Sequence, residues 1–219
     1  MGNSASSASN KLPPLQTASN CVTERMMGTW FVIAVKPTAF ETQNSNAVER
    51  YTWVHDDDDE HKKKKSHNQH DIDIDFTFNA KEPITSKVKS MPQKGWLDVP
   101  APDKEDTPPK SIKTQTGNWK VSPLWPIKLP YLILDVDPKH YHYCVIGYPS
   151  RAYCWIMSRT PQMNDDLYQR LTTDLKEKHQ YDLNGLRKVP QKWTKSEREK
   201  RGLLQEIPDS MLEKEEELN

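Results

Sequence analysis

Apolar and polar side chains alternate without interruption between residues 71 and 78. The apolar positions are Ile72, Ile74, Phe76 and Phe78, and the polar positions between them are Asp71, Asp73, Asp75 and Thr77. Because successive side chains of an extended strand point to opposite faces, this segment has one apolar face and one hydrated face. The pattern therefore predicts an antiparallel strand that covers a core with one of its faces.

Seven further segments are rich in β-branched and aromatic residues and are long enough to hold a strand. They are residues 27–35, 48–54, 84–99 around Trp96, 118–122, 131–136, 141–147 and 152–158. No helical periodicity lies between these segments, so we expect neighbouring strands to be joined locally. Closure into a barrel would remove the exposed edges of such a sheet. The sequence therefore predicts an all-β fold, an eight-stranded up-and-down antiparallel β-barrel.

The period of the apolar residues changes after residue 161. Leu167, Leu171 and Leu175 lie four residues apart, and Asn164 is well placed to cap the start of a helix. This spacing predicts one C-terminal amphipathic helix. Its apolar stripe must cover something, and we expect it to pack on the outside of the barrel.

These elements divide the chain into three parts. Residues 1–20 are expected to be a disordered leader, residues 21–191 the barrel with its helix, and residues 192–219 a charged tail. Thr194 and Glu197 could form a capping box, which would start only a short helix. Because the tail is dense in charged residues, we do not expect it to pack on the barrel.

The charge balance limits the classes of partner. Lys and Arg together number 31, equal to Asp and Glu together, and no basic stripe is present, so we expect no nucleic-acid partner. No apolar run approaches the roughly 20 residues that a membrane-spanning helix needs. The first 20 residues lack the apolar stretch of a secretory signal, and we therefore expect a cytoplasmic protein.

The first six residues, Met1 to Ser6, match the pattern Met-Gly-x-x-x-Ser, in which Gly2 is myristoylated after removal of Met1. A plain disordered leader explains the same residues, and both interpretations stay open. One acyl chain gives only marginal, reversible binding to a membrane. If Gly2 is acylated, we expect peripheral contact with the cytosolic face of a membrane through the N-terminus.

A run of acidic residues passes directly into a run of lysines between residues 56 and 65. Such blocks cannot be buried, so the segment is interpreted as a solvated loop at a hairpin tip. His55, His61, His67 and His70 lie in or beside it, but their spacing matches no defined zinc site. We therefore favour a solvated loop over a metal site, and we expect no metal and no cofactor.

Five stretches together resemble the lipocalin family, in the branch that includes bacterial outer-membrane lipocalin, apolipoprotein D and plant temperature-induced lipocalin. The similarity runs from about residue 23 to residue 191. The stretches are GTWFVIA at 28–34, NAVERYT at 46–52, VSPLWP at 121–126, YLILDVD at 131–137 and GYPSRAYCWIMSRTP at 147–161. The charged block at 56–65 and a proline-rich insertion at 100–109 depart from the family pattern.

The resemblance implies that Trp30 plugs the closed end of the barrel with Arg159 lying across its indole ring, a structural pair rather than a ligand contact. Since alternate positions of a strand face inward, these two residues fix the direction of their neighbours. The expected ligand-binding lining is Val32, Ala34, Tyr51, Trp53, Ile74, Phe76, Phe78, Tyr131, Ile133, Tyr153, Trp155 and Met157.

This lining predicts that the protein binds and carries a small hydrophobic ligand. Fatty acids, lysophospholipids, sterols, retinoids and haem-like molecules would all be suitable. The resemblance further implies a role in lipid transport or in protecting membranes from lipid oxidation and stress. A monomer and a homodimer are both compatible with the sequence.

Two other functions were considered. In an interaction scaffold, the barrel would be filled by its own side chains. A lipocalin-type isomerase would need a thiol in the cavity, and Cys144 is the only candidate because Cys21 precedes the first strand and Cys154 should point outward. We expect no enzymatic activity. We also expect free thiols, because a disulfide directly across the hairpin between Cys144 and Cys154 would be strained.

Overall fold

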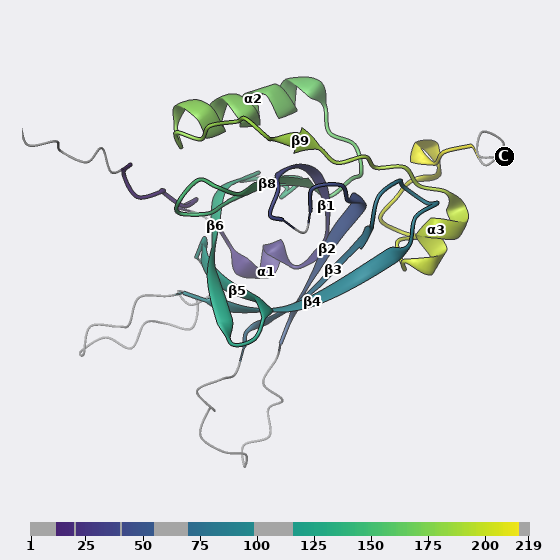
Figure 1. Cartoon of the computed structure of the whole chain (residues 1–219), viewed down its shortest axis with the longest axis horizontal. Helices are drawn as coiled ribbons and strands as arrows, with labels where there is room; N and C mark the ends of the chain where they lie inside the picture. The colour runs from purple at the N-terminus through teal and green to yellow at the C-terminus, as the bar shows by residue number, and fades with distance from the viewer. Residues whose placement is uncertain (1–11, 20, 40, 55–69, 99–115, 215–219) are drawn as a thin grey trace, which may run out of the picture.

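Eight antiparallel strands form a closed up-and-down barrel in the computed structural model, which describes residues 12–19, 21–39, 41–54, 70–98 and 116–214 (Figure 1). Each strand pairs with the next along the chain, and β1 also pairs with β8, which closes the ring. The strands are β1 (Gly28–Lys36), β2 (Ser45–Trp53), β3 (Ile72–Asn79), β4 (Val88–Leu97), β5 (Asn118–Leu124), β6 (Ile127–Val136), β7 (Tyr143–Gly147) and β8 (Cys154–Ser158). The predicted fold class is confirmed.

The alternating segment forms β3 with the orientation that its sequence predicts. Ile72, Ile74, Phe76 and Phe78 are buried in the barrel interior, whereas Asp73 and Asp75 are exposed. All eight residues of β3 pair with β4, from Ile72 opposite Gly95 to Asn79 opposite Val88. The barrel therefore has a continuous apolar interior on this side.

One end of the barrel is closed by α1 (Thr23–Met26) and by the predicted Trp30–Arg159 pair. The guanidinium carbon of Arg159 lies 3.7 Å from the centroid of the fully buried Trp30 ring. The same guanidinium donates to the carbonyl oxygens of Thr29 at 2.9 Å and Arg25 at 2.7 Å, and the indole NH of Trp30 donates to the carbonyl of Met26. One side chain thus ties α1, β1 and the end of β8 together.

Helix α2 (Asp165–Glu177) packs on the outer wall of the barrel, as predicted (Figure 1). The side-chain oxygen of Asn164 accepts from the backbone NH groups of Asp166 and Leu167 and caps the helix. Leu171 and Leu175 are buried against the outward side chains of β6, β7 and β8. The short strand β9 (Arg187–Lys188) follows and adds to β1.

The segment after residue 191 docks on the barrel, although its charge gave no reason to expect this. It contains α3 (Lys195–Lys200), which Thr194 caps, and the 3₁₀ helix η1 (Asp209–Met211). Three apolar side chains separated by charged residues make the contact: Trp193, Leu203 and Ile207 are each 1% exposed and pack with Phe31, Ile33 and Val48. The barrel unit therefore extends beyond residue 191, at least to residue 212.

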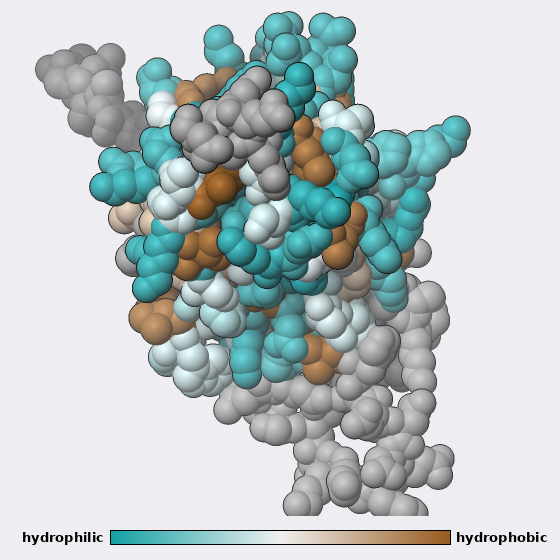
Figure 2. Space-filling model, turned by 90° about the vertical axis from the view of Figure 1, so that its right-hand side faces the viewer, coloured by the Kyte–Doolittle hydropathy of each residue, from teal (hydrophilic) through white to brown (hydrophobic). Residues whose placement is uncertain are grey.

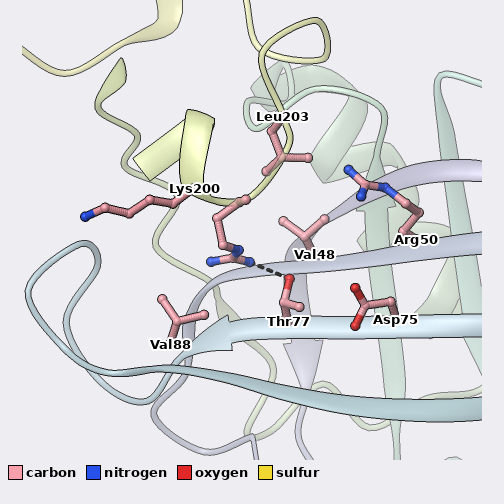
Figure 3. Close-up of a pocket in the computed structure, with 8 residues that line it drawn as sticks. Val48, Arg50, Asp75, Thr77, Val88, Lys200 and Leu203 are labelled. Atoms are coloured by element: carbon pink, nitrogen blue, oxygen red, sulfur yellow. Dashed lines mark hydrogen bonds between the residues drawn. The ribbon is translucent and has the colours of Figure 1, made fainter. Parts of the chain in front are cut away.

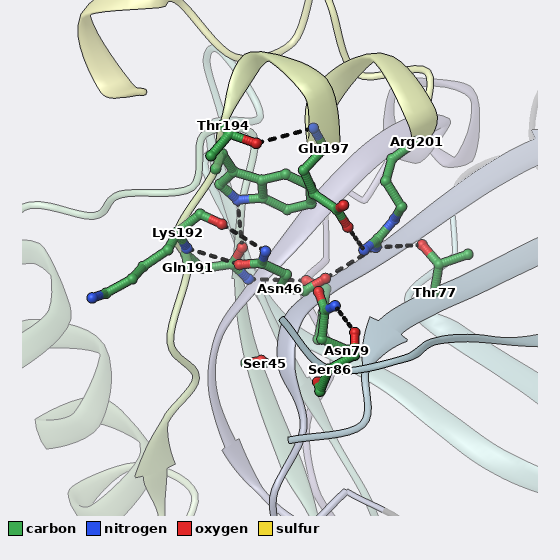
Figure 4. A network of polar contacts seen from close by, with 12 residues as sticks. Ser45, Asn46, Thr77, Asn79, Ser86, Gln191, Lys192, Thr194, Glu197 and Arg201 are labelled. Carbon is green, nitrogen blue, oxygen red and sulfur yellow. Dashed lines mark hydrogen bonds and ion pairs between the residues drawn. The ribbon is translucent and has the colours of Figure 1, made fainter. Parts of the chain in front are cut away.

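Hydrogen bonds to the backbone and side chains of β1, β2 and β3 fix this C-terminal segment (Figure 4). Asn46 and Lys192 exchange two bonds, from the Asn46 amide to the Lys192 carbonyl at 2.6 Å and from the Lys192 NH back to Asn46 at 2.8 Å. Arg201 donates to the carbonyl of Asn46 and to the hydroxyl of Thr77. The amide of Gln191 donates to backbone carbonyls of β1 and β2. These contacts bridge three neighbouring strands from outside.

Part of the predicted leader is also docked. The backbone NH of Ala18 donates to the carbonyl of Ile133 at 2.9 Å, and Arg151 donates to the carbonyl of Pro13 at 2.6 Å. Leu15 packs with the apolar cluster beneath α2. Residues 12–19 therefore belong to the folded unit, whereas Gly2 lies outside the described residues.

The face of the molecule that carries α3 is mostly hydrophilic, with small and separate apolar patches (Figure 2). Within the described ranges, no helix combines the length and the apolar character that crossing a membrane requires.

We predict that the docked C-terminal segment contributes measurably to stability. Leu203→Ala should lower the free energy of unfolding by about 2–5 kcal/mol, because it leaves a cavity where a fully buried side chain packs. The neighbouring Leu204 is 49% exposed, so Leu204→Ala should change it by less than about 0.5 kcal/mol. Urea unfolding of the two variants measures the difference, and equal values would contradict the docking.

The closing pair gives a second prediction. Arg159→Lys should destabilise the fold by about 2–4 kcal/mol, because an ammonium cannot keep the contacts to two backbone carbonyls and the indole face together. Arg170→Lys is the matched control: its side chain is 46% exposed and its ion pairs lie at the surface. That change should cost less than about 0.5 kcal/mol in the same urea experiment.

Candidate functional site

A cavity of about 490 Å³ occupies the barrel interior towards the end opposite Trp30. It is bounded by strand interiors and by the connections that follow β1 and β7. The lining residues are Thr38, Ala39, Glu41, Glu49, Phe76, Met91, Gln93, Val121, Pro123, Leu124, Leu129, Pro130, Tyr131, Tyr148, Tyr153 and Trp155. Most of this surface is apolar, with a few polar groups set into it.

The up-and-down topology settles which connections surround the entrance. The strand ends that are joined by the charged loop and by the proline-rich insertion, Trp53 with Ile72 and Leu97 with Asn118, lie at the same end of the barrel as Trp30. The cavity opens at the other end, beside the β5–β6 hairpin. The strand ends that flank the two departures from the family pattern therefore lie away from the mouth of the cavity.

Four of the twelve predicted lining residues border the cavity: Phe76, Tyr131, Tyr153 and Trp155. Seven others lie in the barrel interior, where they pack on one another and on their neighbours without bordering the cavity. These are Val32, Tyr51, Trp53, Ile74, Phe78, Ile133 and Met157. The alternation of inward positions was thus predicted well, but it did not separate the packed part of the interior from the open part.

The prediction that Ala34 faces inward is wrong. The pairing of β1 with β8 shifts by one residue between Val32, which pairs with Met157, and Ala34, which pairs with Ile156. Such a bulge reverses the alternation beyond it. Ala34 therefore packs under α2, and Val35 takes the inward position.

A buried carboxyl group, Glu49, lies in the cavity wall and was not among the predicted site residues. Its side chain is 5% exposed, and its Oε2 accepts from the hydroxyl of Tyr51 at 2.5 Å and from that of Tyr131 at 3.0 Å. The two hydroxyl oxygens lie 2.6 Å apart. Three oxygen-bearing side chains from β2 and β6 thus form one compact polar cluster within the apolar interior.

Burial raises the pKa of Glu49 from 4.5 to about 7, although the hydrogen bonds from Tyr51 and Tyr131 oppose the shift. Burial likewise raises the pKa of both phenols well above their usual value, and the negative charge of Glu49 adds to the effect. Both tyrosines therefore keep their protons near neutral pH. The titrating member of the cluster is the carboxyl group.

A second carboxylate, Glu41, borders the cavity at the connection after β1. Its Oε1 accepts from the indole NH of Trp155 at 2.9 Å, and its Oε2 accepts from the NH and hydroxyl of Thr38. Both carboxylate oxygens of Glu41 therefore already accept hydrogen bonds from protein groups. The cavity lining therefore contains two carboxyl groups that the sequence did not predict there.

Strand alternation in the sequence could have identified Glu49 as an inward-facing residue. Tyr51 was expected to face inward, and in a strand the residue two positions earlier faces the same way. The structure confirms this alternation, since Ala47 and Tyr51 lie in the interior cluster and Val48 packs outside. Glu41 lies in a connection, where no periodic signal applies.

The three cysteines are free and buried. Gly147 pairs with Cys154 and Cys144 with Met157, so the two hairpin thiols do not oppose each other. Cys144 faces the barrel interior without bordering the cavity, and Cys154 lies beneath α2. Burial raises the pKa of Cys21 to about 12 and that of Cys154 to about 11, and it raises the pKa of Cys144 strongly as well.

A smaller hollow of about 230 Å³ lies outside the barrel, between α3 and strands β2 and β3 (Figure 3). Arg201 borders it and donates to the hydroxyl of Thr77. Arg50 and Asp75 border it as well. Its charged groups of both signs make it unlike the apolar cavity of the barrel.

Three of the four histidines considered as metal ligands, His55, His61 and His67, lie outside the described residues. The fourth, His70, contacts the carboxylate of Asp73 through its Nε2 at 2.7 Å. Across the ranges that the structure describes, no group of three or more His, Cys, Asp or Glu residues is arranged to hold a metal ion.

The family model for the lipocalin-like domain matches residues 60–191, which is more than half of the chain. This chain belongs to the lipocalin-like family. Lipocalins bind small hydrophobic ligands, and the homologues are generally binding proteins rather than enzymes.

Individual relatives agree with this assignment. The lipocalin is 29% identical over 177 residues to temperature-induced lipocalin-1 of Arabidopsis thaliana, covering 80% of this chain and 81% of the relative. Insecticyanin of the tobacco hornworm Manduca sexta has a similar structure, with a TM-score of 0.52 and 16% identity over 84% of this chain and 87% of that one. Lobster apocrustacyanin A1 has a TM-score of 0.50 and 13% identity over 85% and 94% of the two chains. The two structural matches support the barrel fold.

We predict that Glu49 makes the stability of this lipocalin fall as the pH rises. A carboxyl group whose pKa is higher in the folded than in the unfolded state binds its proton more tightly when folded, so its contribution is present below about pH 4.5 and is lost as the pH rises through about 7. The loss should reach about 3 kcal/mol by about pH 8. Glu49→Gln should remove this dependence.

The measurement is the free energy of unfolding in urea at about pH 5 and about pH 8 for both proteins. Glu82→Gln, at an exposed carboxyl group, is the control and should follow the wild type at both values. A pH dependence that is identical in wild type and Glu49→Gln would show that Glu49 is not buried as described.

Proposed function

We propose that this lipocalin binds and carries a small, mainly apolar molecule in its barrel cavity. The observation that carries the proposal is the cavity itself, because a scaffold barrel would be filled by its own side chains. Its volume of about 490 Å³ lies within the range of roughly 300–1,000 Å³ typical of ligand pockets, and its lining is largely aromatic and aliphatic. Binding would be driven by the removal of apolar surface from water.

The rim of the cavity supports the same proposal. Leu124 and Ile127, on the β5–β6 hairpin, are 70% and 54% exposed, and Leu124 itself borders the cavity. Exposed apolar side chains next to an apolar cavity form a continuous path along which a hydrophobic ligand stays in contact with similar surface. We therefore place the entrance for ligand at this hairpin.

We propose that the function is binding without catalysis. A nucleophilic thiol needs a lowered pKa and access to substrate, whereas burial raises the pKa of Cys144 and its side chain does not border the cavity. The two carboxyl groups of the lining are held by tyrosines, by Thr38 and by Trp155. None of these groups is placed as an acid–base pair around an open substrate position.

We propose a physiological role in the response to stress. The name of the Arabidopsis relative describes a lipocalin induced by temperature, and this favours a role in stress, such as protecting membranes from lipid oxidation. A cytoplasmic location, with contact to a membrane through acylated Gly2, also remains a proposal. Intact-mass analysis of protein from its own cells tests the acylation of Gly2, since acylation would add the mass of a myristoyl group to the chain.

Uptake of the fluorescent probe N-phenyl-1-naphthylamine by delipidated protein tests the carrier function. The wild type should bind the probe with increased fluorescence. Leu129→Trp should weaken binding by at least about tenfold, because the larger ring fills the cavity that Leu129 borders. Leu204→Trp adds the same ring at an exposed position outside the cavity lining, and should leave binding unchanged.

Two results would contradict the proposal. Absence of uptake by the delipidated wild type would mean that the cavity does not admit an apolar molecule. Equal binding by Leu129→Trp and Leu204→Trp would place the probe elsewhere on the surface.

A further inference from the structure

The buried carboxyl group in the cavity wall, Glu49, has one oxygen to which no described residue donates. Both bonds to Glu49 end on Oε2, and no described residue donates to Oε1. The side chain is buried and borders the cavity. By contrast, both oxygens of Glu41 already accept from Thr38 or Trp155.

Counting hydrogen atoms shows what Oε1 offers. Three oxygen pairs in the cluster lie at hydrogen-bonding distance: Tyr51–Glu49 at 2.5 Å, Tyr131–Glu49 at 3.0 Å and Tyr51–Tyr131 at 2.6 Å. The two phenols supply only two hydrogen atoms. A proton on Oε2 of Glu49 supplies the third, and the raised pKa of Glu49 agrees with this arrangement. Whether Glu49 is protonated on Oε2 or ionised, Oε1 remains an acceptor.

The described lining contains no cationic side chain that would attract an anion. None of its residues is Lys, Arg or His, its two ionisable carboxyl groups would repel an anion when charged, and its remaining side-chain donors, such as Gln93, Tyr148 and Tyr153, are neutral. A carboxylate in this interior would place acceptor against acceptor in surroundings of low dielectric, where an unpaired charge is costly. An apolar molecule with a donating end would instead satisfy Oε1.

We propose that Glu49 Oε1 binds the polar end of the ligand, and that this end is a hydrogen-bond donor, a hydroxyl or an ammonium group, on an otherwise apolar molecule. The inference rests on the proposed carrier function and narrows its ligand class. Sterol-like or long-chain alcohols and amines fit the site. Fatty acid anions of similar length do not.

Calorimetric titration of the delipidated full chain near neutral pH with decanol, decylamine and decanoate tests this. The three probes share one chain and differ only at the polar end. Decanol and decylamine should each bind at least about tenfold more tightly than decanoate, because only they can donate to Oε1.

Two variants assign the preference to its residue. In Glu49→Gln, the side-chain oxygen can accept from the two tyrosines, which turns the amide NH₂ towards the cavity. The preference for donors should then disappear or reverse in favour of decanoate. Glu82→Gln removes an exposed acidic group outside the cavity lining, and should keep the preference.

The outcomes separate the two proposals. Equal or tighter binding of decanoate by the wild type, or a donor preference that survives in Glu49→Gln, would overturn the inference while leaving the carrier function intact. If N-phenyl-1-naphthylamine and all three chains fail to bind, the carrier function itself is wrong. The comparison within the wild type does not depend on whether either variant folds.

Discussion

The pairing of β1 with strands on both of its sides is the constraint on which the rest of this structure depends. Residues 28–31 pair with β2, and residues 31–36 pair with β8. This double pairing leaves no free edge in the ring and gives every strand one inward and one outward face. The interior face then holds Trp30 at one end and the cavity at the other, while the outward faces of the strands receive α2 and the C-terminal segment.

Much of this arrangement could be predicted from the sequence because strand periodicity is a local property. The alternation in β3, the cap at Asn164 and the spacing of Leu171 and Leu175 each determine their element without reference to the rest of the chain. The inward direction of Met157 followed from that of Arg159 by the same rule. Local rules therefore predicted the fold and most of the interior.

The remaining features depend on contacts between distant residues. The bulge that turns Ala34 outward arises in the pairing with β8, more than a hundred residues away in the chain. The apolar residues of the C-terminal segment, Trp193, Leu203 and Ile207, are too few and too widely spaced to form a periodic pattern. They are buried because they pack on the outer surface of β1 and β2. The size of the cavity depends on how fully neighbouring side chains occupy the interior, which alternation alone does not determine.

The strand ends that lead into two long connections lie at the plugged pole of the barrel, opposite the mouth of the cavity. The strand ends at Trp53 and Ile72, and those at Leu97 and Asn118, lie near the plug formed by Trp30. The plug and the cavity lining therefore occupy opposite ends of the same strands. Substitutions can accumulate at the plugged pole without changing the side chains that border the cavity at the other.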